Sequence, residues 1–204
     1  MTITRIVLLT QPPEGAVLGK ILTAHNPDLE IALVSDKAAL ENLLAEDLAA
    51  TRLLSFCSPV IVPARLLQAL PGPSYNFHPG PPDRPGRYPS VFAIYDQAAH
   101  YGVTIHEMTD RVDAGPIVAA EWFAVPAGAA LADLEALSLE YLVAVFKRLA
   151  PFLALNANPL PRIFIPWSGV KRTKADCEAI CQLTPGLSET EIALRQRACG
   201  SLLR

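Results

Sequence analysis

The sequence is poor in charged residues and in long apolar runs, and each shortage excludes a class of protein. Of its 204 residues only 18% are charged, with 17 basic against 20 acidic side chains and a formal net charge of −3. A protein that binds nucleic acid is expected to have clustered Lys and Arg, so no nucleic-acid partner is predicted. No stretch offers 18 consecutive apolar residues, and a membrane-spanning helix is therefore not expected.

Cysteine is also scarce. The spacings of Cys57, Cys177, Cys181 and Cys199 are typical of neither a disulfide framework nor a zinc site. We therefore expect four reduced thiols and a cytoplasmic protein. Cys177 and Cys181 are four residues apart on a predicted helix, but no further ligand lies near them in the sequence. Two semi-buried side chains are the favoured interpretation, and no metal site is predicted.

Apolar residues and prolines are abundant instead. A hydrophobic content of 51% in 204 residues predicts a folded chain with the length of one domain. The 19 prolines exceed the average usage of about 5%, and seven of them lie between residues 71 and 89. Because proline fixes φ, this cluster predicts a long irregular segment held at low entropic cost.

Apolar runs alternate with helical patterns along the first half of the chain. Residues 5–9, 30–35 and 53–56 are predicted to form buried strands, and residues 37–49 a helix. Such alternation indicates a Rossmann-like α/β fold, a mostly parallel sheet with helices on both faces. Because no Gly-x-Gly-x-x-Gly follows the first strand, a dinucleotide site is not predicted.

The second half of the chain continues this alternation and then changes. We expect an α/β domain over residues 1–154 and a helical tail over residues 155–204 that packs on it or extends it. In the tail, Ser188 with Glu191 is typical of a capping box that starts a helix. The elements predicted before the tail are strands over 74–77, 101–108 and 116–125, and helices over 91–98 and 131–149.

Polar side chains at the end of the predicted strand 74–77 are the first chemical signal. In Asn76-Phe77-His78-Pro79, the period of two places the amide and the imidazole on the same side of the strand. An amide donor beside a protonatable imidazole is suited to a developing oxyanion. The alternative, an Asn that caps the turn and a hydrogen-bonded His at a strand end, is favoured by this tetrapeptide alone.

A second polar element ends in the turn Asp113-Ala114-Gly115-Pro116. This turn can direct a carboxylate back toward an imidazole, where the carboxylate accepts or relays a proton. The alternative is that Asp113 only forms the turn, which is the commoner meaning of Asp-x-Gly.

Together the two elements resemble the formyltransferase superfamily that uses 10-formyltetrahydrofolate. The Asn76-x-His78-Pro79 loop precedes a segment that contains Gly-x-Thr104-x-His106 and ends in Asp113-x-Gly-x-Ile, and the resemblance covers roughly residues 53 to 154. The resemblance implies the formyltransferase fold and an enzyme of one-carbon metabolism. The implied reaction is transfer of a formyl group from 10-formyltetrahydrofolate to a primary amine of a small molecule.

The resemblance also implies roles for individual residues. Asn76 holds the formyl oxygen, protonated His78 stabilises the tetrahedral intermediate, and Asp113 tunes His78 and moves the proton of the amine. Thr104 matches a hydroxyl near that proton path. His106 matches a recurring histidine of the family, for which a purely structural role stays open.

In the family, the pterin ring lies between two backbone segments, which match residues 58–63 and 108–113 of this chain. For Val60, Ile61 and Val62 a place in the core is an equally favoured interpretation. The cofactor-binding residues that the resemblance implies are Pro59, Val60, Ile61 and Val62 in the first segment and Thr109, Asp110 and Val112 in the second.

Departures from the family pattern bear on the acceptor. Residues 10–15, Thr-Gln-Pro-Pro-Glu-Gly, replace the glycine-rich phosphate loop of glycinamide ribonucleotide transformylase, and its prolines and glutamate disfavour a phosphate there. The proline-rich loop after His78 differs as well, so the identity of the acceptor stays open. One aromatic and three basic residues lie together in the tail: Trp167, Lys171, Arg172 and Lys174. Such a group either contacts an anionic acceptor or, more often, forms a solvated face.

Two other functions stay open. The same three residues serve an enzyme that passes the formyl group to water or takes it from another one-carbon carrier, and a non-catalytic member of the family would bind folate without turnover. The oligomeric state is not predicted.

Overall fold

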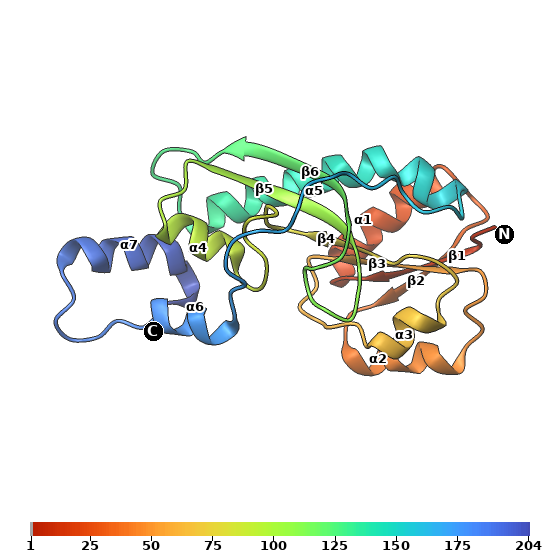
Figure 1. Cartoon of the computed structure of the whole chain (residues 1–204), viewed down its shortest axis with the longest axis horizontal. Helices are drawn as coiled ribbons and strands as arrows, with labels where there is room; N and C mark the ends of the chain where they lie inside the picture. Colours follow the sequence, from red (N-terminus) through yellow and green to blue (C-terminus); the bar gives the residue numbers. More distant parts are fainter. Residues whose placement is uncertain (1) are drawn as a thin grey trace. The chain divides into compact units, whose positions relative to one another are not determined.

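The computed structural model describes residues 2–204 and contains one six-stranded sheet with the order β2-β1-β3-β4-β5-β6 (Figure 1). Strands β1 to β4 pair in parallel. The prediction of an α/β fold with a mostly parallel sheet is confirmed. The strands are β1 (Arg5–Leu9), β2 (Glu30–Val34), β3 (Thr51–Phe56), β4 (Tyr75–His78), β5 (His100–Glu107) and β6 (Ile117–Ala124).

Strands β5 and β6 run antiparallel. The Glu107 N–H donates to the Pro116 carbonyl over 2.9 Å at one end of the pair. At the other end the Val125 N–H donates to the Ala99 carbonyl, also over 2.9 Å. The loop of residues 108–116 connects the two strands directly, without a crossover, as an antiparallel pair allows.

Seven α-helices and two 3₁₀ turns accompany the sheet within the described residues. The helix predicted over residues 37–49 ends earlier, at Asn42, and a 3₁₀ turn follows it. Helix α3 was not predicted, since six residues are too few to show a helical period. The helices are α1 (Pro12–Thr23), α2 (Lys37–Asn42), α3 (Ala64–Ala69), α4 (Pro89–Tyr95), α5 (Leu131–Leu155), α6 (Lys174–Ile180) and α7 (Glu189–Cys199), and the turns are η1 (Leu43–Ala45) and η2 (Gly200–Leu202).

The residues group into two compact units. Unit 1 comprises Met1–His78, Ile105–Ala119 and Val143–Phe164, and unit 2 comprises Pro79–Thr104, Ala120–Leu142 and Ile165–Arg204. Each unit is thus assembled from three separate stretches of the chain. The boundary at residue 154 between a catalytic domain and a tail stays a prediction.

In unit 1, helices cover both faces of the strands. Figure 1 shows α1 on one side of β1 and β3, and α2 with α3 on the other. Helix α1 packs closely because a Cβ on Gly15 would lie 2.8 Å from a methyl of Leu33 in β2. On the opposite face one apolar cluster joins the strands to α2, η1 and α3, with Val7, Leu9, Leu53, Leu40, Leu43 and Leu66 among its buried members.

Strand β2 was predicted to be buried, and this is wrong for most of its length. Only Val34 is buried, and Leu33 is 49% exposed. The reason lies in the strand order: β2 is at the edge of the sheet and has β1 as its one neighbour. A run of apolar residues does not reveal whether the strand has one neighbour or two.

A buried arginine attaches the end of α5 to the sheet in unit 1. Arg52 of β3 donates to the carbonyls of Leu153 and Asn156 over 2.9 and 2.8 Å. It thereby satisfies carbonyl groups that a helix terminus leaves without intrahelical partners. Burial lowers the pKa of Arg52. The neighbouring Tyr75 hydroxyl accepts the Leu160 N–H over 2.7 Å, and burial raises the pKa of Tyr75.

In unit 2, helices α4, α6 and α7 meet around three cysteines. A disulfide joins Cys181 to Cys199, so the prediction of four reduced thiols is wrong for these two. The spacing did not reveal the bond, because the ends of α6 and α7 come together only when both helices pack on Val91 and Phe92 of α4. The cytoplasmic location stays a prediction that the cysteines no longer support.

The start of α7 is where the sequence placed it. The Ser188 hydroxyl accepts the Glu191 N–H over 3.2 Å, as in the first half of the predicted capping box. The Glu191 carboxylate instead pairs with Arg195 and accepts the Tyr95 hydroxyl. Among residues 2–204 no helix is long and apolar enough to cross a membrane.

Candidate functional site

Asn76 and His78 lie on β4, the last of the parallel strands, and both belong to unit 1. Phe77 between them packs its ring against Phe56 and Phe146, with centroids 5.7 and 5.1 Å apart. Because successive side chains alternate across a strand, this packing turns Asn76 and His78 to the opposite face. His78 is buried and Asn76 is half-buried.

Asp113 lies in the loop of residues 108–116 that joins β5 to β6. Its φ of +47° falls in the left-handed region, which costs on the order of 1–2 kcal/mol for a residue with a Cβ. A Cβ on Gly115 would lie 1.9 Å from the Glu107 carbonyl oxygen, so only glycine allows the chain to come so close there. The turn therefore brings the Asp113 side chain back to the sheet, where it is buried.

The structure brings Asn76, His78 and Asp113, which we call the trio, into one cluster in unit 1. An oxygen of Asp113 lies 3.8 Å from Nδ1 of His78. Its other oxygen lies 3.3 Å from Nε2 of His106. The amide nitrogen of Asn76 is 3.1 Å from the same Nε2. The two sequence elements thus meet, and His106 lies between the members of the trio.

His106 has a defined place in this cluster. Its Nδ1 lies 2.9 Å from the backbone carbonyl of Glu107, which only accepts hydrogen bonds, so Nδ1 bears a proton. A neutral His106 accepts an amide N–H of Asn76 at Nε2, whereas a protonated His106 donates from Nε2 to Asp113. The sequence left a purely structural role open for His106, because it does not show that β4 and β5 are neighbours.

Thr104 belongs to unit 2 and holds the loop that follows His78. Its hydroxyl donates to the Gly80 carbonyl over 2.7 Å. The Tyr101 hydroxyl donates to the Pro79 carbonyl over 2.6 Å. Both bonds lie in unit 2, so in this structure the Thr104 hydroxyl is engaged by the loop backbone.

The first predicted folate segment, residues 58–63, is irregular chain between β3 and α3. Val62 is buried in the core, Val60 packs against the same cluster, and Ile61 is 61% exposed. The core interpretation therefore suits Val62, but it does not suit Ile61. Pro59 is exposed as well.

The second predicted folate segment, residues 108–113, borders the same apolar cluster through Met108. Thr109 forms a local turn in which its hydroxyl donates to the Arg111 carbonyl over 3.0 Å. Thr109, Asp110 and Val112 are exposed. Both segments thus lie at the edge of one core cluster of unit 1, and each has an exposed apolar side chain, Ile61 or Val112.

Comparison with known families gives a match over most of the sheet. The profile of a family described as formyl transferase matches residues 6–145. A stretch of 67 residues is 43% identical to dTDP-4-amino-4,6-dideoxyglucose formyltransferase of Mycobacterium tuberculosis strain H37Rv. That match covers 32% of this chain and 27% of the length of the relative.

Solved structures share the fold at low sequence identity. A 4-N formyltransferase from Francisella tularensis is similar with a TM-score of 0.74 and 20% identity, over 96% of this chain and 88% of that one. An N-formyltransferase from Helicobacter canadensis, in complex with folinic acid and dTDP-3-aminofucose, is similar with a TM-score of 0.70 and 19% identity. The second match covers 97% of this chain and 80% of the other.

Proposed function

The chain belongs to the formyl transferase family, as its motifs predicted, and on this premise we propose that it transfers a formyl group from 10-formyltetrahydrofolate to the primary amine of a nucleotide-linked sugar. The observation that carries the proposal is the meeting of Asn76, His78 and Asp113 in unit 1. The acceptor class is supported by the mycobacterial relative, whose name specifies an amino sugar bound to dTDP.

The reaction needs no covalent intermediate with the protein. The amine nitrogen attacks the formyl carbon, and the carbonyl oxygen becomes an oxyanion. The bond from the formyl carbon to the folate nitrogen then breaks, the amine gives up one proton, and the leaving folate nitrogen takes up one proton to give tetrahydrofolate. The protein has to position both substrates, to stabilise the oxyanion and to take up that proton.

Each member of the trio has one of these tasks. Asn76 has two amide N–H donors; one is directed at His106, and the second is assigned to the formyl oxygen. Protonated His78 is the cationic donor to the oxyanion, with the Asp113 carboxylate as its counter-charge. Asp113 accepts the amine proton, directly or through a water molecule.

The folate donor is supported by the Helicobacter structure, which contains folinic acid. We assign the pterin to residues 58–63 and 108–113. Backbone groups at the ends of strands are the expected place for a ligand in an open α/β sheet. The exposed side chains of Ile61 and Val112 supply apolar contact for the ring.

The test is an assay of tetrahydrofolate release from 10-formyltetrahydrofolate, with and without dTDP-4-amino-4,6-dideoxyglucose. Asn76→Ala, His78→Ala and Asp113→Asn should each lower kcat by about 10²- to 10⁴-fold. The matched controls are His25→Ala and Asp28→Asn, two exposed side chains of unit 1, and these should retain wild-type rates.

Each other result has a definite meaning. Release without an amine identifies the hydrolase. Folate binding without turnover across a panel of amino sugars identifies a non-catalytic folate-binding protein. Wild-type rates in His78→Ala and Asp113→Asn would show that the trio is not the catalytic site.

A further inference from the structure

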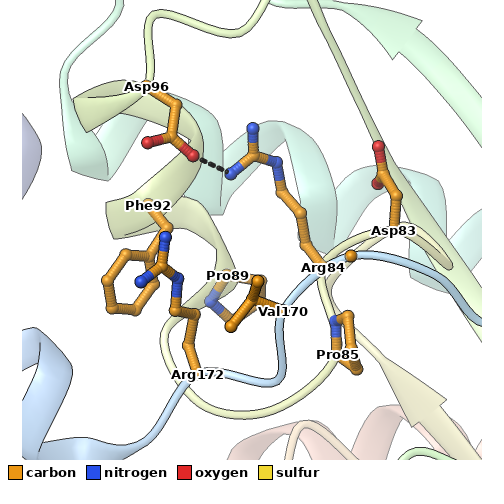
Figure 2. Close-up of a pocket in the computed structure, with 9 residues that line it drawn as sticks. Asp83, Arg84, Pro85, Pro89, Phe92, Asp96, Val170 and Arg172 are labelled. Atoms are coloured by element: carbon orange, nitrogen blue, oxygen red, sulfur yellow. Dashed lines mark hydrogen bonds and ion pairs between the residues drawn. The ribbon is translucent and has the colours of Figure 1, made fainter.

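Unit 2 contains a cavity of about 230 Å³ between the proline-rich loop, helix α4 and the segment after residue 167. The residues that line it include Arg84 of the loop, Pro89 and Phe92 of α4, Asp96 at the end of α4, and Val170 and Arg172 of the later segment (Figure 2). Its volume is below the roughly 300–1,000 Å³ of pockets for drug-sized ligands. A cavity of this size suits one small group rather than a whole nucleotide.

The backbone that surrounds the cavity is held in place before any ligand binds. The loop and the later segment pair through the Ser168 N–H to the Pro82 carbonyl, over 3.0 Å. The Arg172 N–H donates to the Pro85 carbonyl over 3.1 Å, and the Arg172 carbonyl accepts the Arg87 N–H over 2.9 Å. Arg172 is therefore fixed at both its backbone groups.

Two glycines allow this pairing. A Cβ on Gly86 would lie 2.2 Å from the Arg172 carbonyl oxygen, and a Cβ on Gly169 would lie 2.0 Å from the Asp83 carbonyl oxygen. Both glycines also have positive φ values, +98° and +71°. The close approach of the two segments thus depends on the absence of side chains at these positions.

Arg172 provides a cation inside the cavity. Its guanidinium lies 4.8 Å over the ring of Phe92, a cation–π contact that leaves the N–H groups at the edge of the guanidinium available. Within residues 2–204 the Arg172 side chain forms no ion pair with a carboxylate. The pKa of the Asp176 carboxyl is lowered mainly by its hydrogen bonds to Thr173. The positive charge of Arg172 is only a minor cause of this lowering.

The other charged groups of the cavity leave Arg172 as the group available for a ligand. Arg84 is paired with Asp96 over 2.7 Å, as Figure 2 shows. Asp83 directs its carboxylate away from Arg172 in the same view. A planar guanidinium donates two parallel N–H groups, and this geometry matches two oxygens of a phosphate.

We propose that this cavity binds a phosphate or diphosphate group through Arg172. The group has two possible sources, the nucleotide of the acceptor or a separate phosphate compound. Its assignment to the acceptor rests on the proposed function, whereas the binding itself does not.

The test measures the binding of inorganic pyrophosphate to the full chain by calorimetry. Arg172→Gln should weaken binding about tenfold or more, which corresponds to about 1.4 kcal/mol. Arg172→Lys keeps the positive charge but loses the two parallel N–H groups of the guanidinium, and it should give an intermediate affinity for pyrophosphate. Lys147→Gln removes one positive charge from an exposed position of α5 and should bind within twofold of wild type.

Two results would overturn the proposal. One is the absence of saturable pyrophosphate binding at millimolar concentration in the wild-type protein. The other is equal affinity of wild type and Arg172→Gln. Thermal unfolding of each variant checks that the chain is folded, and the backbone bonds of residue 172 do not depend on its side chain.

A second measurement separates the two sources of phosphate. If the acceptor supplies it, Arg172→Gln raises KM for the nucleotide-linked amino sugar and leaves kcat unchanged. If pyrophosphate binding is lost while KM is unchanged, the cavity serves a separate phosphate compound. Pyrophosphate binding is measured without formyl transfer, so a failure of the proposed function would leave this test intact.

Discussion

The candidate catalytic cluster of unit 1 and the cavity of unit 2 are built from different kinds of structure. Asn76 and His78 lie on a strand, and Asp113 lies in the turn of an antiparallel pair. The cavity has a proline-rich loop, one short helix and an irregular segment around it, and no strand lines it. In unit 1 the sheet positions the polar groups; in unit 2, backbone bonds between two irregular segments do so.

This difference affects what each site tolerates. A side chain on a strand keeps its direction as long as the register is kept, because the alternation of faces is a property of the strand. Arg172 keeps its place only while residues 168–172 stay paired with residues 82–87. We therefore expect perturbations of the tail to affect the cavity of unit 2 and to spare the trio.

The largest effect expected from this contrast concerns the disulfide. Reduction of Cys181–Cys199, which closes a loop with a separation of 18 residues, should lower the free energy of unfolding by about 3 kcal/mol. Denaturation with and without a reductant measures this. Amide exchange should become faster in α6 and α7 but not in β1 and β3.

Cys57→Ser is the matched control, because Cys57 belongs to unit 1 and is not part of the disulfide. It should respond to the reductant as the wild type does. Equal stability with and without reductant would show that the tail does not need the covalent link.

The second prediction compares two glycines that both face a carbonyl oxygen. Alanine at Gly115 or at Gly86 places its Cβ about 2 Å from that oxygen, so the backbone must separate, and each variant should lose about 2 kcal/mol of stability. Gly115→Ala displaces the turn of Asp113 and should lower kcat. Gly86→Ala separates the loop from Arg172 and should weaken pyrophosphate binding with kcat retained.

Gly128→Ala is the control for strain alone, since Gly128 has a φ of +74° and no atom within 4 Å of the added Cβ. It should lose about 1 kcal/mol and keep both functions. If Gly115→Ala and Gly86→Ala had the same functional effect, the two sites would not be independent.

The smallest effect concerns His106, which we expect to position Asn76 and Asp113. His106→Leu should lower kcat about tenfold, or about 1.4 kcal/mol, with KM for the acceptor unchanged. His106→Gln offers an amide within reach of the former Nε2 position and should restore part of the rate. The control is His100→Leu, at the exposed start of the same strand, which should keep the wild-type rate. If His106→Leu were fully active, His106 would contribute only to packing and would not position Asn76 or Asp113.

Much of the fold was predictable because it depends on local patterns. The strands β1, β3 and β5 were placed to within a few residues, β1 and β3 from short β-branched or apolar runs and β5 from its alternation of side chains. The exposure of β2 was not predictable, because it depends on its place in the sheet. Helix α2 ended early and α3 was missed for the related reason that short helices take their stability from tertiary packing.

The candidate site was predictable in part. Alternation along residues 75–78 indicated that Asn76 and His78 share one face of the strand. The Asp-x-Gly turn indicated that the Asp113 carboxylate can be directed back toward an imidazole. His106 needs the adjacency of β4 and β5, which only the sheet order supplies. The role of Arg172 was left open between a contact and a solvated face, and nothing near it in the sequence indicates Phe92.

The sequence by itself determined the α/β class, because periods within short stretches are limited by covalent geometry. The resemblance of its motifs indicated the family, and on that resemblance Asn76, His78 and Asp113 are the predicted catalytic residues. The tertiary structure decided that His106 lies among the trio, that Cys181 meets Cys199, and that Arg172 lies on Phe92. Each of these is a contact between segments far apart in the chain, which depends on how the whole molecule packs and not on any local pattern.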